Sequence, residues 1–557
     1  GRGRQRREAG VVDAAWEAEF AAARLDRWSR AVQPPGTSGR RDVIVTSALP
    51  YVNNEPHLGN LIGCVLSADC YARFARLAGH NVLFICGTDE HGTATEVRAL
   101  SEGCTPAEIC DRYFTLHSAV YDDFHADFDF FGRTSRPVHH TIVRDVFEEL
   151  DAAGLMRLES VTQVYCEQCA RFLADRFVRG TCPHCSALDA LGDQCERCQR
   201  LYEATELGNP CCTLCSGPAT TRSSQHYFLD LPAMTAPLTE LVEAAAREGR
   251  WTANAVAITR AWLREGLRPR CITRDLSWGV PVPRAEFDGK CFYVWFDAPL
   301  GYLSITAEAQ PAHWQAWWEL PSVELVQFMA KDNAPFHTLL FPAMLRGGGR
   351  SRVVPHRMGV TEYLTFEGSK FSKSRSVGVF GSDVRRSGVP ADCWRFYLLW
   401  VRPESADADF RWRDFQRVIN DVLLAGIGNF VHRVLKWLHT RGGAVPECDL
   451  SALDDADRAL LAATWQLLEE FTRNCEELRL RDGLRTVARL ADAGNAHVQR
   501  AVDARAEEKT MRNKMALSAN VARLVAALLE PFTPTLAQRI YLILRLKRGE
   551  QIGRAHV

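Results

Sequence analysis

The chain has 557 residues, of which 46% are hydrophobic and 24% charged, and its 67 basic and 68 acidic residues give a net charge of −1. This composition excludes a collagen-like, coiled-coil or wholly disordered protein, and at about 150 residues per domain the length suggests three or four domains. Because the charges balance, a nucleic-acid-binding surface must be a local patch. No apolar run approaches the ~20 residues of a membrane helix, so we expect a soluble protein without a membrane partner.

The two ends are set apart from the fold. Residues 1–40 combine a basic start, a stretch with helical spacing at 15–28 and the linker QPPGTSG, which suggests an N-terminal extension and linker. Residues 552–557 (IGRAHV) resemble a translated sequencing adapter and are interpreted as an artefactual tail.

An α/β pattern begins at residue 43. The run VIVTSAL (43–49) is short, apolar and β-branched, as buried parallel strands are. The loop PYVNNEPHLGN, a helix-periodic stretch ending at Gly79 and a second apolar run ending in GTDEHG follow it. This order predicts a doubly wound, Rossmann-like parallel sheet. Ligands bind such sheets at the carboxyl ends of the strands, so the two loops are candidate binding loops.

Later segments complete the expected organisation. The apolar runs KCFYVWFDA (290–298) and VELVQFMAKD (323–332) predict strands of the second half of the sheet, so the cysteine-rich region before them is read as an inserted domain. From about Phe415 onward, long helix-periodic stretches predict an appended α-helical bundle.

Nine of the 19 cysteines lie between Cys166 and Cys215. A tight cluster in a large chain favours metal over a disulfide framework. Four of them have the spacing C-x2-C-x9-C-x2-C, which predicts a closed, structural Zn²⁺ site: Cys182, Cys185, Cys195 and Cys198. The outer pairs would close a second site, less specifically because 42 residues separate them: Cys166, Cys169, Cys212 and Cys215.

Two loops suit a nucleotide. His57, Gly59 and Asn60 lie where the first strand gives way to a helix, whose N-terminus favours phosphate. The segment EGSKFSKS (367–374) places Lys370 and Lys373 in a loop bearing glycine and hydroxyl groups. Ammonium groups are cations suited to phosphate.

These motifs together resemble those of class I aminoacyl-tRNA synthetases, with HLGN and KFSKS as the two signature sequences of that class. The similarity is strongest to methionyl-tRNA synthetases of the eukaryotic cytosolic type. It extends from about Arg41 to the mid-400s through ALPYVNNEPHLGN, FICGTDEHGTATE, CARFLADRF, ITRDLSWG, FYVWFDA, GYLSITA, QFMAKDN and KFSKS.

The resemblance implies a cytoplasmic, ATP-dependent methionine–tRNA ligase. It would use L-methionine, ATP with Mg²⁺ and tRNA(Met), and synthetase-complex partners would bind through termini missing from this sequence. It implies catalytic roles for His57, Asn60, Lys370 and Lys373, and ATP contacts for His57, Gly59, Asn60, Asp332 and Lys373. It implies a methionine pocket of Leu49, Tyr51, Asp89, Trp295, Pro299, Tyr302 and His337.

The same resemblance assigns tRNA contacts to Asn429 and Arg433 on one helix face. Ala504 stands where the family has a tryptophan that stacks on an anticodon base, which weakens the expected anticodon reading.

We expect seven segments. They are the extension and linker (1–40), the first half of the catalytic domain (41–154), the inserted zinc-binding domain (155–258), the second half of the catalytic domain (259–345), a stem-contact region with the KFSKS loop (346–414), a helical anticodon-binding domain (415–551) and the tail (552–557).

The sequence allows two alternative interpretations. Synthetases for leucine, isoleucine or valine carry an editing insertion too large for the span between Arg41 and Phe341, and a cysteine enzyme is the remaining relative. A non-catalytic, zinc-ribbon nucleic-acid-binding derivative is disfavoured by the intact HLGN and KFSKS sequences.

Overall fold

The computed structural model describes residues 32–544 except 174–176, 193–194, 196, 199, 201 and 373–376. Its centre is a five-stranded parallel sheet, which confirms the expected α/β class. The strand order is β14 (Pro355–Thr361), β13 (Val323–Ala330), β1 (Asp42–Ser47), β2 (Asn81–Thr88) and β3 (Phe130–Arg133). The order reverses between β1 and β13, and such a switch point is where ligands bind parallel sheets.

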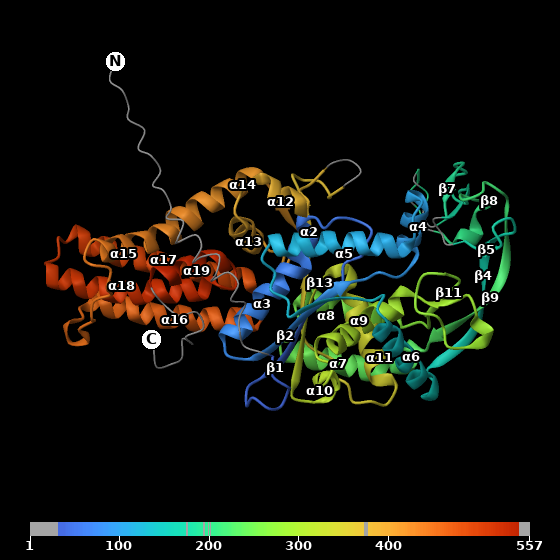
Figure 1. Cartoon of the computed structure of the whole chain (residues 1–557), viewed down its shortest axis with the longest axis horizontal. Helices are drawn as coiled ribbons and strands as arrows, with labels where there is room; N and C mark the ends of the chain where they lie inside the picture. Colours follow the sequence, from blue (N-terminus) through green and yellow to red (C-terminus); the bar gives the residue numbers. More distant parts are fainter. Residues whose placement is uncertain are drawn as a thin grey trace, which may run out of the picture.

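Both faces of the sheet are covered by helices (Figure 1). Val43 and Val45 of β1 belong to a core shared with α3 (Leu66–Leu77) and the C-terminal helices, whereas Ile44 belongs to a second core. That second core is built with α6 (Pro137–Ala152), α9 (Val294–Ala309) and α11 (Phe341–Gly347). Burial on both faces explains why β1 and β2 read as unbroken apolar runs.

The remaining helices of the sheet region are α4 (Thr93–Glu102), α5 (Pro106–Asp123), α7 (Thr235–Arg247), α8 (Ala253–Glu265), α10 (Trp314–Glu319), α12 (Gly381–Ser387) and α13 (Ala391–Trp400). Four short strands pair in twos outside the main sheet: β11 (Thr273–Arg274) with β12 (Cys291–Phe292), and β15 (Leu364–Phe366) with β16 (Ala408–Phe410).

The HLGN sequence begins a continuous helical segment. The short helix α2 (Leu58–Asn60) runs into the π-helical η1 (Leu61–Val65) and then into α3, with right-handed helical backbone at each junction. His57 precedes α2 as its N-cap. The candidate nucleotide loop is therefore rigidly joined to the helix that packs on the sheet.

The cysteine-rich region is carried on a long antiparallel ribbon. Strands β4 (Met156–Cys166) and β9 (Ala219–Leu229) pair along their whole length, and the ribbon ends are the pairs Met156–Leu229 and Cys166–Ala219. The ribbon reaches outward at the right of Figure 1. Strands β5 (Arg171–Phe172) and β10 (Arg270–Cys271) pair with the ribbon, and a separate three-stranded sheet in this region contains β6 (Val178–Thr181), β7 (Ala190–Leu191) and β8 (Gly208–Cys212).

One sequence expectation was wrong. The run KCFYVWFDA forms only the two-residue strand β12, outside the central sheet, and then enters α9 at Val294. Twelve of the 16 residues of α9 are buried, so the segment has no apolar–polar periodicity from which a helix could be distinguished from a buried strand.

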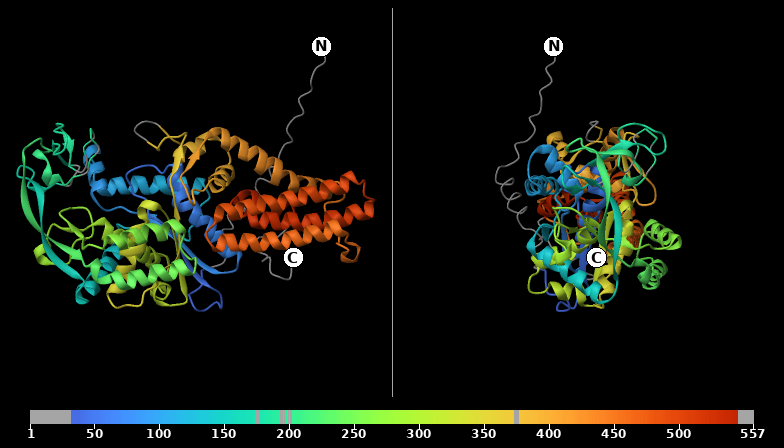
Figure 2. Two further views of the ribbon diagram at one scale, coloured as in Figure 1. Left: turned by 180° about the vertical axis from the view of Figure 1, so that it is seen from behind. Right: turned by 90° about the vertical axis from the view of Figure 1, so that its right-hand side faces the viewer.

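The C-terminal part is helical, as expected, and forms the opposite end of the molecule from the ribbon (Figures 1 and 2). It contains α14 (Trp412–Arg417), η8 (Val418–Gly428), α15 (Asn429–His439), α16 (Asp455–Glu476), α17 (Leu480–Asp503), α18 (Glu508–Leu529) and α19 (Pro534–Ile543). Gly494 of α17 allows the ring of Phe430 to approach, since a Cβ there would lie 2.4 Å from it.

The stretch Trp412–His439 is, by length and composition alone, apolar enough to cross a membrane. The sequence reading did not anticipate this. In the structure 33% of its most apolar window is buried, with Ile419, Leu423 and Ile427 among the residues that join the main core.

Candidate active site and metal sites

The seven residues expected to contact methionine line one pocket of about 50 Å³. They come from four segments that are far apart in the sequence: Leu49 and Tyr51 follow β1, Asp89 follows β2, Trp295, Pro299 and Tyr302 lie on α9, and His337 lies in the π-helical η7 (Phe336–Leu340) after β13. The pocket is therefore at the carboxyl ends of the strands. A close approach of α9 to Leu49 requires Gly301, where a Cβ would lie 2.7 Å from the leucine.

A buried hydrogen-bond chain fixes one wall of this pocket. His337 Nδ1 lies 2.8 Å from the carbonyl oxygen of Asn333, and His337 Nε2 lies 2.8 Å from the hydroxyl of Tyr302. A carbonyl can only accept, so Nδ1 donates and Nε2 accepts the tyrosine proton. Burial lowers the pKa of His337 to about 4 and keeps this imidazole neutral.

Asp89 supplies a carboxyl group that lacks a matching cation in the described part of the chain. It is buried, and its Oδ1 has no hydrogen-bond partner. Burial, and then the nearby carboxylates of Asp297 and Glu90, raise its pKa well above the usual value. A buried carboxylate in this position is suited to an ammonium ligand, which would relieve both unfavourable effects.

The two candidate nucleotide loops meet. The ring of His57 stacks on Phe371 of KFSKS with centroids 4.4 Å apart and planes 3° apart. His57 and Asn60 also cap α2 reciprocally, with His57 N–H donating to Asn60 Oδ1 and Asn60 N–H to His57 Nδ1. Gly59 fits beneath the imidazole, because a Cβ would lie 3.0 Å from the ring. Burial lowers the pKa of His57 to about 4.

Three further residues were expected at the nucleotide site: Lys370, Lys373 and Asp332. Lys370 is exposed one position before Phe371, and Lys373 lies outside the described residues. Asp332 follows β13 in the turn η6 (Lys331–Asn333) and accepts a hydrogen bond from Tyr363. Its neighbour Lys331 forms ion pairs with Glu362 and Asp407 at 2.6 and 3.0 Å.

The eight expected zinc ligands form two separate groups of four. One group is Cys182, Cys185, Cys195 and Cys198, and the other is Cys166, Cys169, Cys212 and Cys215. In the first group the Sγ–Sγ distances are 3.8 Å for Cys182–Cys198 and 3.6 Å for Cys185–Cys195. In the second group they are 3.5 Å for Cys166–Cys215 and 3.9 Å for Cys169–Cys212. Four sulfurs bound at about 2.3 Å around a tetrahedral Zn²⁺ would be separated by about 3.8 Å, so both groups fit the ion.

One thiol of the outer group is favoured in the thiolate form that binds metal. The backbone N–H of Cys169 donates to Cys166 Sγ and lowers the pKa of that thiol to about 7. The N–H of His184 also donates a hydrogen bond to Cys182 Sγ. Neither His184 nor Cys211 belongs to a ligand group.

The expected tRNA residues lie together on α15 but contact another helix. Asn429 Nδ2 donates to Asn495 Oδ1 at 3.2 Å, and Arg433 Nη2 donates to Gln499 Oε1 at 2.9 Å. Both partners belong to α17 and are neutral, so the charge of Arg433 is not neutralised by them. Ala504 ends the same helix as its C-cap.

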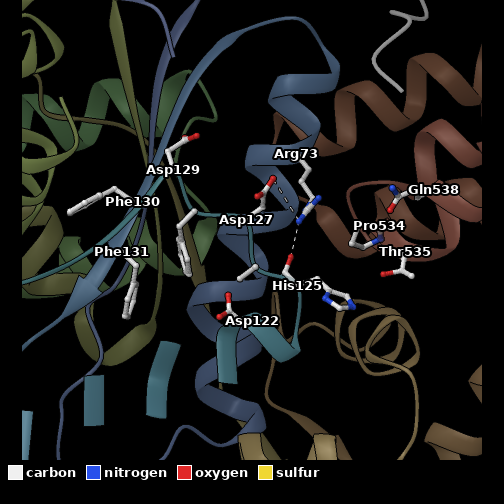
Figure 3. Close-up of a pocket in the computed structure, with 12 residues that line it drawn as sticks. Arg73, Asp122, His125, Asp127, Asp129, Phe130, Phe131, Pro534, Thr535 and Gln538 are labelled. Carbon is white, nitrogen blue, oxygen red and sulfur yellow. Dashed lines mark hydrogen bonds and ion pairs between the residues drawn. The ribbon is translucent and has the colours of Figure 1, made fainter. Parts of the chain in front are cut away.

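Sequence reasoning missed five pocket residues: Ala48, Val294, Ala298, Asn333 and Phe336. Asn333 completes the QFMAKDN sequence and Phe336 follows it, and Phe336 packs on Trp295 with ring centroids 5.1 Å apart. A separate cavity of about 500 Å³ lies between the segment 122–131 and α19, with Arg73 at its wall (Figure 3). None of the expected site residues lines it.

Comparison with known proteins agrees with this geometry. A family model described as tRNA synthetases class I (M) matches residues 43–435, so the chain belongs to the class I tRNA synthetases. It is 47% identical over 516 residues to the probable cytoplasmic methionine–tRNA ligase of Dictyostelium discoideum and 47% identical over 517 residues to the cytoplasmic methionine–tRNA ligase of Homo sapiens. Within its class the chain is a member of the methionyl-tRNA synthetases.

The matches cover 91% of this chain in both cases, but 70% of the Dictyostelium protein and 57% of the human protein. The chain thus spans little more than half of the human relative. The fold also matches a solved Mycobacterium tuberculosis methionyl-tRNA synthetase in complex with methionyl-adenylate, with a TM-score of 0.73 and 24% identity over 92% of this chain and 95% of that one.

Proposed function

We propose that the chain itself activates L-methionine with ATP and transfers it to tRNA(Met). In the first step a methionine carboxylate oxygen attacks the α-phosphorus of ATP, the bond to the β-phosphate oxygen breaks, and methionyl-adenylate and pyrophosphate form. In the second step a hydroxyl of the tRNA 3′-terminal ribose takes the methionyl group and releases AMP. The observation that carries the proposal is the convergence of seven expected residues on one pocket at the carboxyl ends of the strands.

The pocket suits the three parts of methionine. Asp89 pairs with the ammonium group, and its unpartnered Oδ1 is available for it. Trp295, Tyr302 and Phe336 offer aromatic surface to the thioether, a contact worth about 0.3–1.5 kcal/mol. The neutral His337 and Tyr302 hold each other in place without presenting a charge to this apolar side chain.

Adenylate formation needs no protein nucleophile, so the work of the residues is to position the reactants and stabilise phosphate charge. His57, Gly59, Asn60 and Asp332 would hold ATP, and Lys370 and Lys373 would stabilise the charge that develops on its phosphates. The stacking of His57 on Phe371 supports this assignment, because it joins the two loops across the nucleotide position. Mg²⁺ would accompany ATP.

Two structural zinc ions are proposed for the cysteine groups. Four thiolates complete the coordination of each ion and leave no open position for substrate, so neither metal takes part in the reaction. Arg171, which lies two positions after Cys169, donates a hydrogen bond to the carboxylate of Glu96. The same carboxylate accepts hydrogen bonds from Ser277 and Trp278. The zinc-bearing ribbon is thereby fastened to the loops beside the pocket.

The tRNA-binding and cellular assignments rest on the family. Asn429 and Arg433 would contact the anticodon region, with Arg433 able to leave the neutral Gln499 at little electrostatic cost. Relatives named cytoplasmic support a cytoplasmic location.

The decisive experiment is ATP–pyrophosphate exchange with each amino acid in turn. We expect exchange with methionine, and loss of it in Asp89→Asn. The matched control is Asp288→Asn, an exposed aspartate of the same domain outside the pocket. Exchange with another amino acid would reassign the substrate, and none with any would favour a non-catalytic binding protein.

A further inference from the structure

A polar cluster lies directly behind the methionine pocket and lines no part of it. It consists of His91, His139 and Asp297, which are 3%, 0% and 0% exposed. His91 Nδ1 lies 2.6 Å from Asp297 Oδ2, and His139 Nε2 lies 3.9 Å from the same oxygen. None of the three was among the residues expected from the sequence.

The cluster joins the two walls of the pocket. His91 follows Asp89 by two positions in the loop after β2, and Asp297 lies on α9 between Trp295 and Pro299. The hydrogen bond therefore connects residues 206 positions apart, one beside the ammonium-binding carboxylate and one beside the aromatic wall. This hydrogen bond directly links the loop that carries Asp89 to the helix that carries Trp295 and Pro299.

Charge explains why this link is firm. Burial alone would favour a neutral Asp297, but His91 and His139 outweigh that effect and lower its pKa. In the described structure Asp297 Oδ1 has no hydrogen-bond partner, so this carboxylate depends on the histidines that face its Oδ2. Removing the donor would leave a buried, uncompensated charge about one helical turn from the pocket residues.

The loop that carries His91 is fixed on its other side as well. The carbonyl of Glu90 accepts a 2.6 Å hydrogen bond from Trp278 Nε1, and the Glu90 N–H donates to Thr134 Oγ1. The Asp89 N–H donates to the carbonyl of Pro50. Because the backbone of this loop is held in place, a displacement of His91 would also displace Asp89.

Two histidines and a carboxylate are also a set that could hold a metal ion. The distance of 2.6 Å between His91 Nδ1 and Asp297 Oδ2 indicates a hydrogen bond instead. Two ligand atoms on one tetrahedral zinc at about 2.0–2.1 Å would be about 3.3 Å apart.

We propose that His91 is a positioning residue for methionine binding, which sets the separation of Asp89 from Trp295 through its hydrogen bond to Asp297. This inference rests on the proposed function, since it concerns the same pocket. It adds a residue that touches neither substrate nor nucleotide and acts through two that are expected to touch methionine.

The test compares three variants by ATP–pyrophosphate exchange, with KM measured separately for methionine and ATP. We expect His91→Ala to raise KM for methionine by about 10- to 100-fold, the effect of a misplacement of about 1 Å, while KM for ATP stays near wild type. His91→Asn should restore most of the loss, because its amide nitrogen can donate from the position of Nδ1. His140→Ala is the matched control: its ring lies 5.5 Å from that of His91, outside the cluster.

Several results would overturn the proposal. They are an unchanged KM for methionine in His91→Ala, equal increases for methionine and ATP, or failure of His91→Asn to rescue. A third bound zinc that disappears in His91→Ala would show a metal site instead. If the wild-type chain lacks methionine-dependent exchange, the proposed function itself is wrong. If the wild type exchanges normally but His91→Ala leaves KM for methionine unchanged, only the role of His91 is wrong.

Discussion

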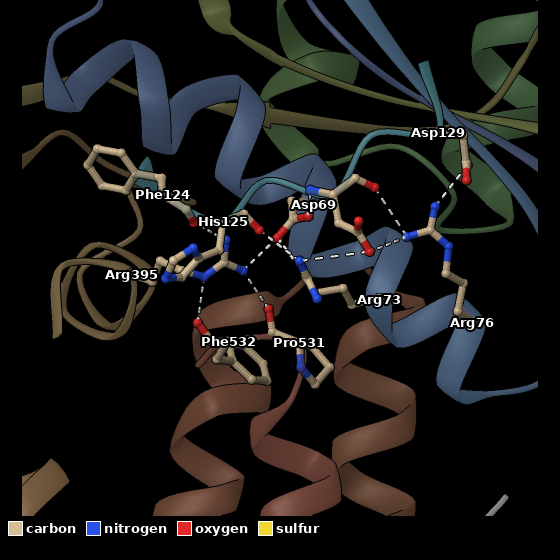
Figure 4. A network of polar contacts seen from close by, with 10 residues as sticks. Asp69, Arg73, Arg76, Phe124, His125, Asp129, Arg395, Pro531 and Phe532 are labelled. Atoms are coloured by element: carbon tan, nitrogen blue, oxygen red, sulfur yellow. Dashed lines mark hydrogen bonds and ion pairs between the residues drawn. The ribbon is translucent and has the colours of Figure 1, made fainter. Parts of the chain in front are cut away.

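Arg395 of α13 donates a 2.6 Å hydrogen bond to Asp69 of α3, and neither side chain is exposed to solvent (Figure 4). The same guanidinium donates to the carbonyl oxygens of Phe124, Pro531 and Phe532, each 2.9 Å away. Because α3 continues from HLGN and residues 531–532 join α18 to α19, a single side chain ties the candidate nucleotide site to the helical bundle.

We expect Arg395→Met to lower the free energy of unfolding by about 3–5 kcal/mol, since Asp69 and three buried carbonyls lose their donor. Asp69 would keep two donors, Arg73 at 2.9 Å and the backbone N–H of Asp127 at 2.8 Å. Thermal and urea denaturation would measure the change. Arg385→Met serves as the control, because its pair with Asp123 is at the surface and should contribute less than about 1 kcal/mol. Wild-type stability of Arg395→Met would refute the structural role.

The zinc assignment predicts a count. Elemental analysis of purified protein should find two zinc ions per chain, and Cys182→Ser and Cys166→Ser should each lose one. Cys211→Ser should keep both, because this neighbour of Cys212 is not in either ligand group. A value of one in the wild type would remove the outer site, and a value below one-half after expression with ample zinc would remove the inner site too.

Lys373→Ala should slow adenylate formation by about 10²–10³-fold while methionine still binds, the scale of losing one preorganised charge contact. Single-turnover adenylation and equilibrium binding of methionine measure the two effects. Lys436→Ala, on α15 of the bundle, is the control and should adenylate normally. Near-wild-type adenylation by Lys373→Ala would refute the phosphate role.

Methionine binding should depend on pH through Asp89. The pKa of this carboxyl is raised by burial and by Asp297 and Glu90, and only its ionised form pairs with an ammonium group. KM for methionine should therefore increase as pH falls through that raised pKa and reach its lowest value above it. His57 and His337, with pKa values of about 4, stay neutral at higher pH and do not contribute. In Asp89→Asn the dependence should vanish; a persisting slope would point to another group.

Arg433→Ala should weaken tRNA aminoacylation and leave tRNA-independent exchange intact. Gln499→Ala removes only the neutral partner of Arg433 and should aminoacylate normally. Ala504→Trp should strengthen tRNA binding by about 1–3 kcal/mol if the residue faces the anticodon, as stacking on one base would. Equal losses of exchange and aminoacylation in Arg433→Ala would indicate a folding defect instead.

The sequence revealed local chemistry better than long-range contacts. The strands at 42–47 and 81–88, both cysteine groups and the pocket residues were recognisable because each lies in a short pattern or motif. The helix at 294–309 was misread, since it is buried all round. The links of His91 to Asp297 and of Asp69 to Arg395 span 206 and 326 positions, and no local pattern specifies which distant residue will become the partner.

The paired ends of the β4–β9 ribbon have an evolutionary consequence. Since Met156 lies opposite Leu229, the chain leaves the catalytic body and returns to it at neighbouring points. Everything between those points can be lengthened, trimmed or exchanged by recombination without displacing a strand of the central sheet. Natural variation in length should therefore concentrate beyond this junction, while the spacing of the pocket-bearing segments on either side stays constrained.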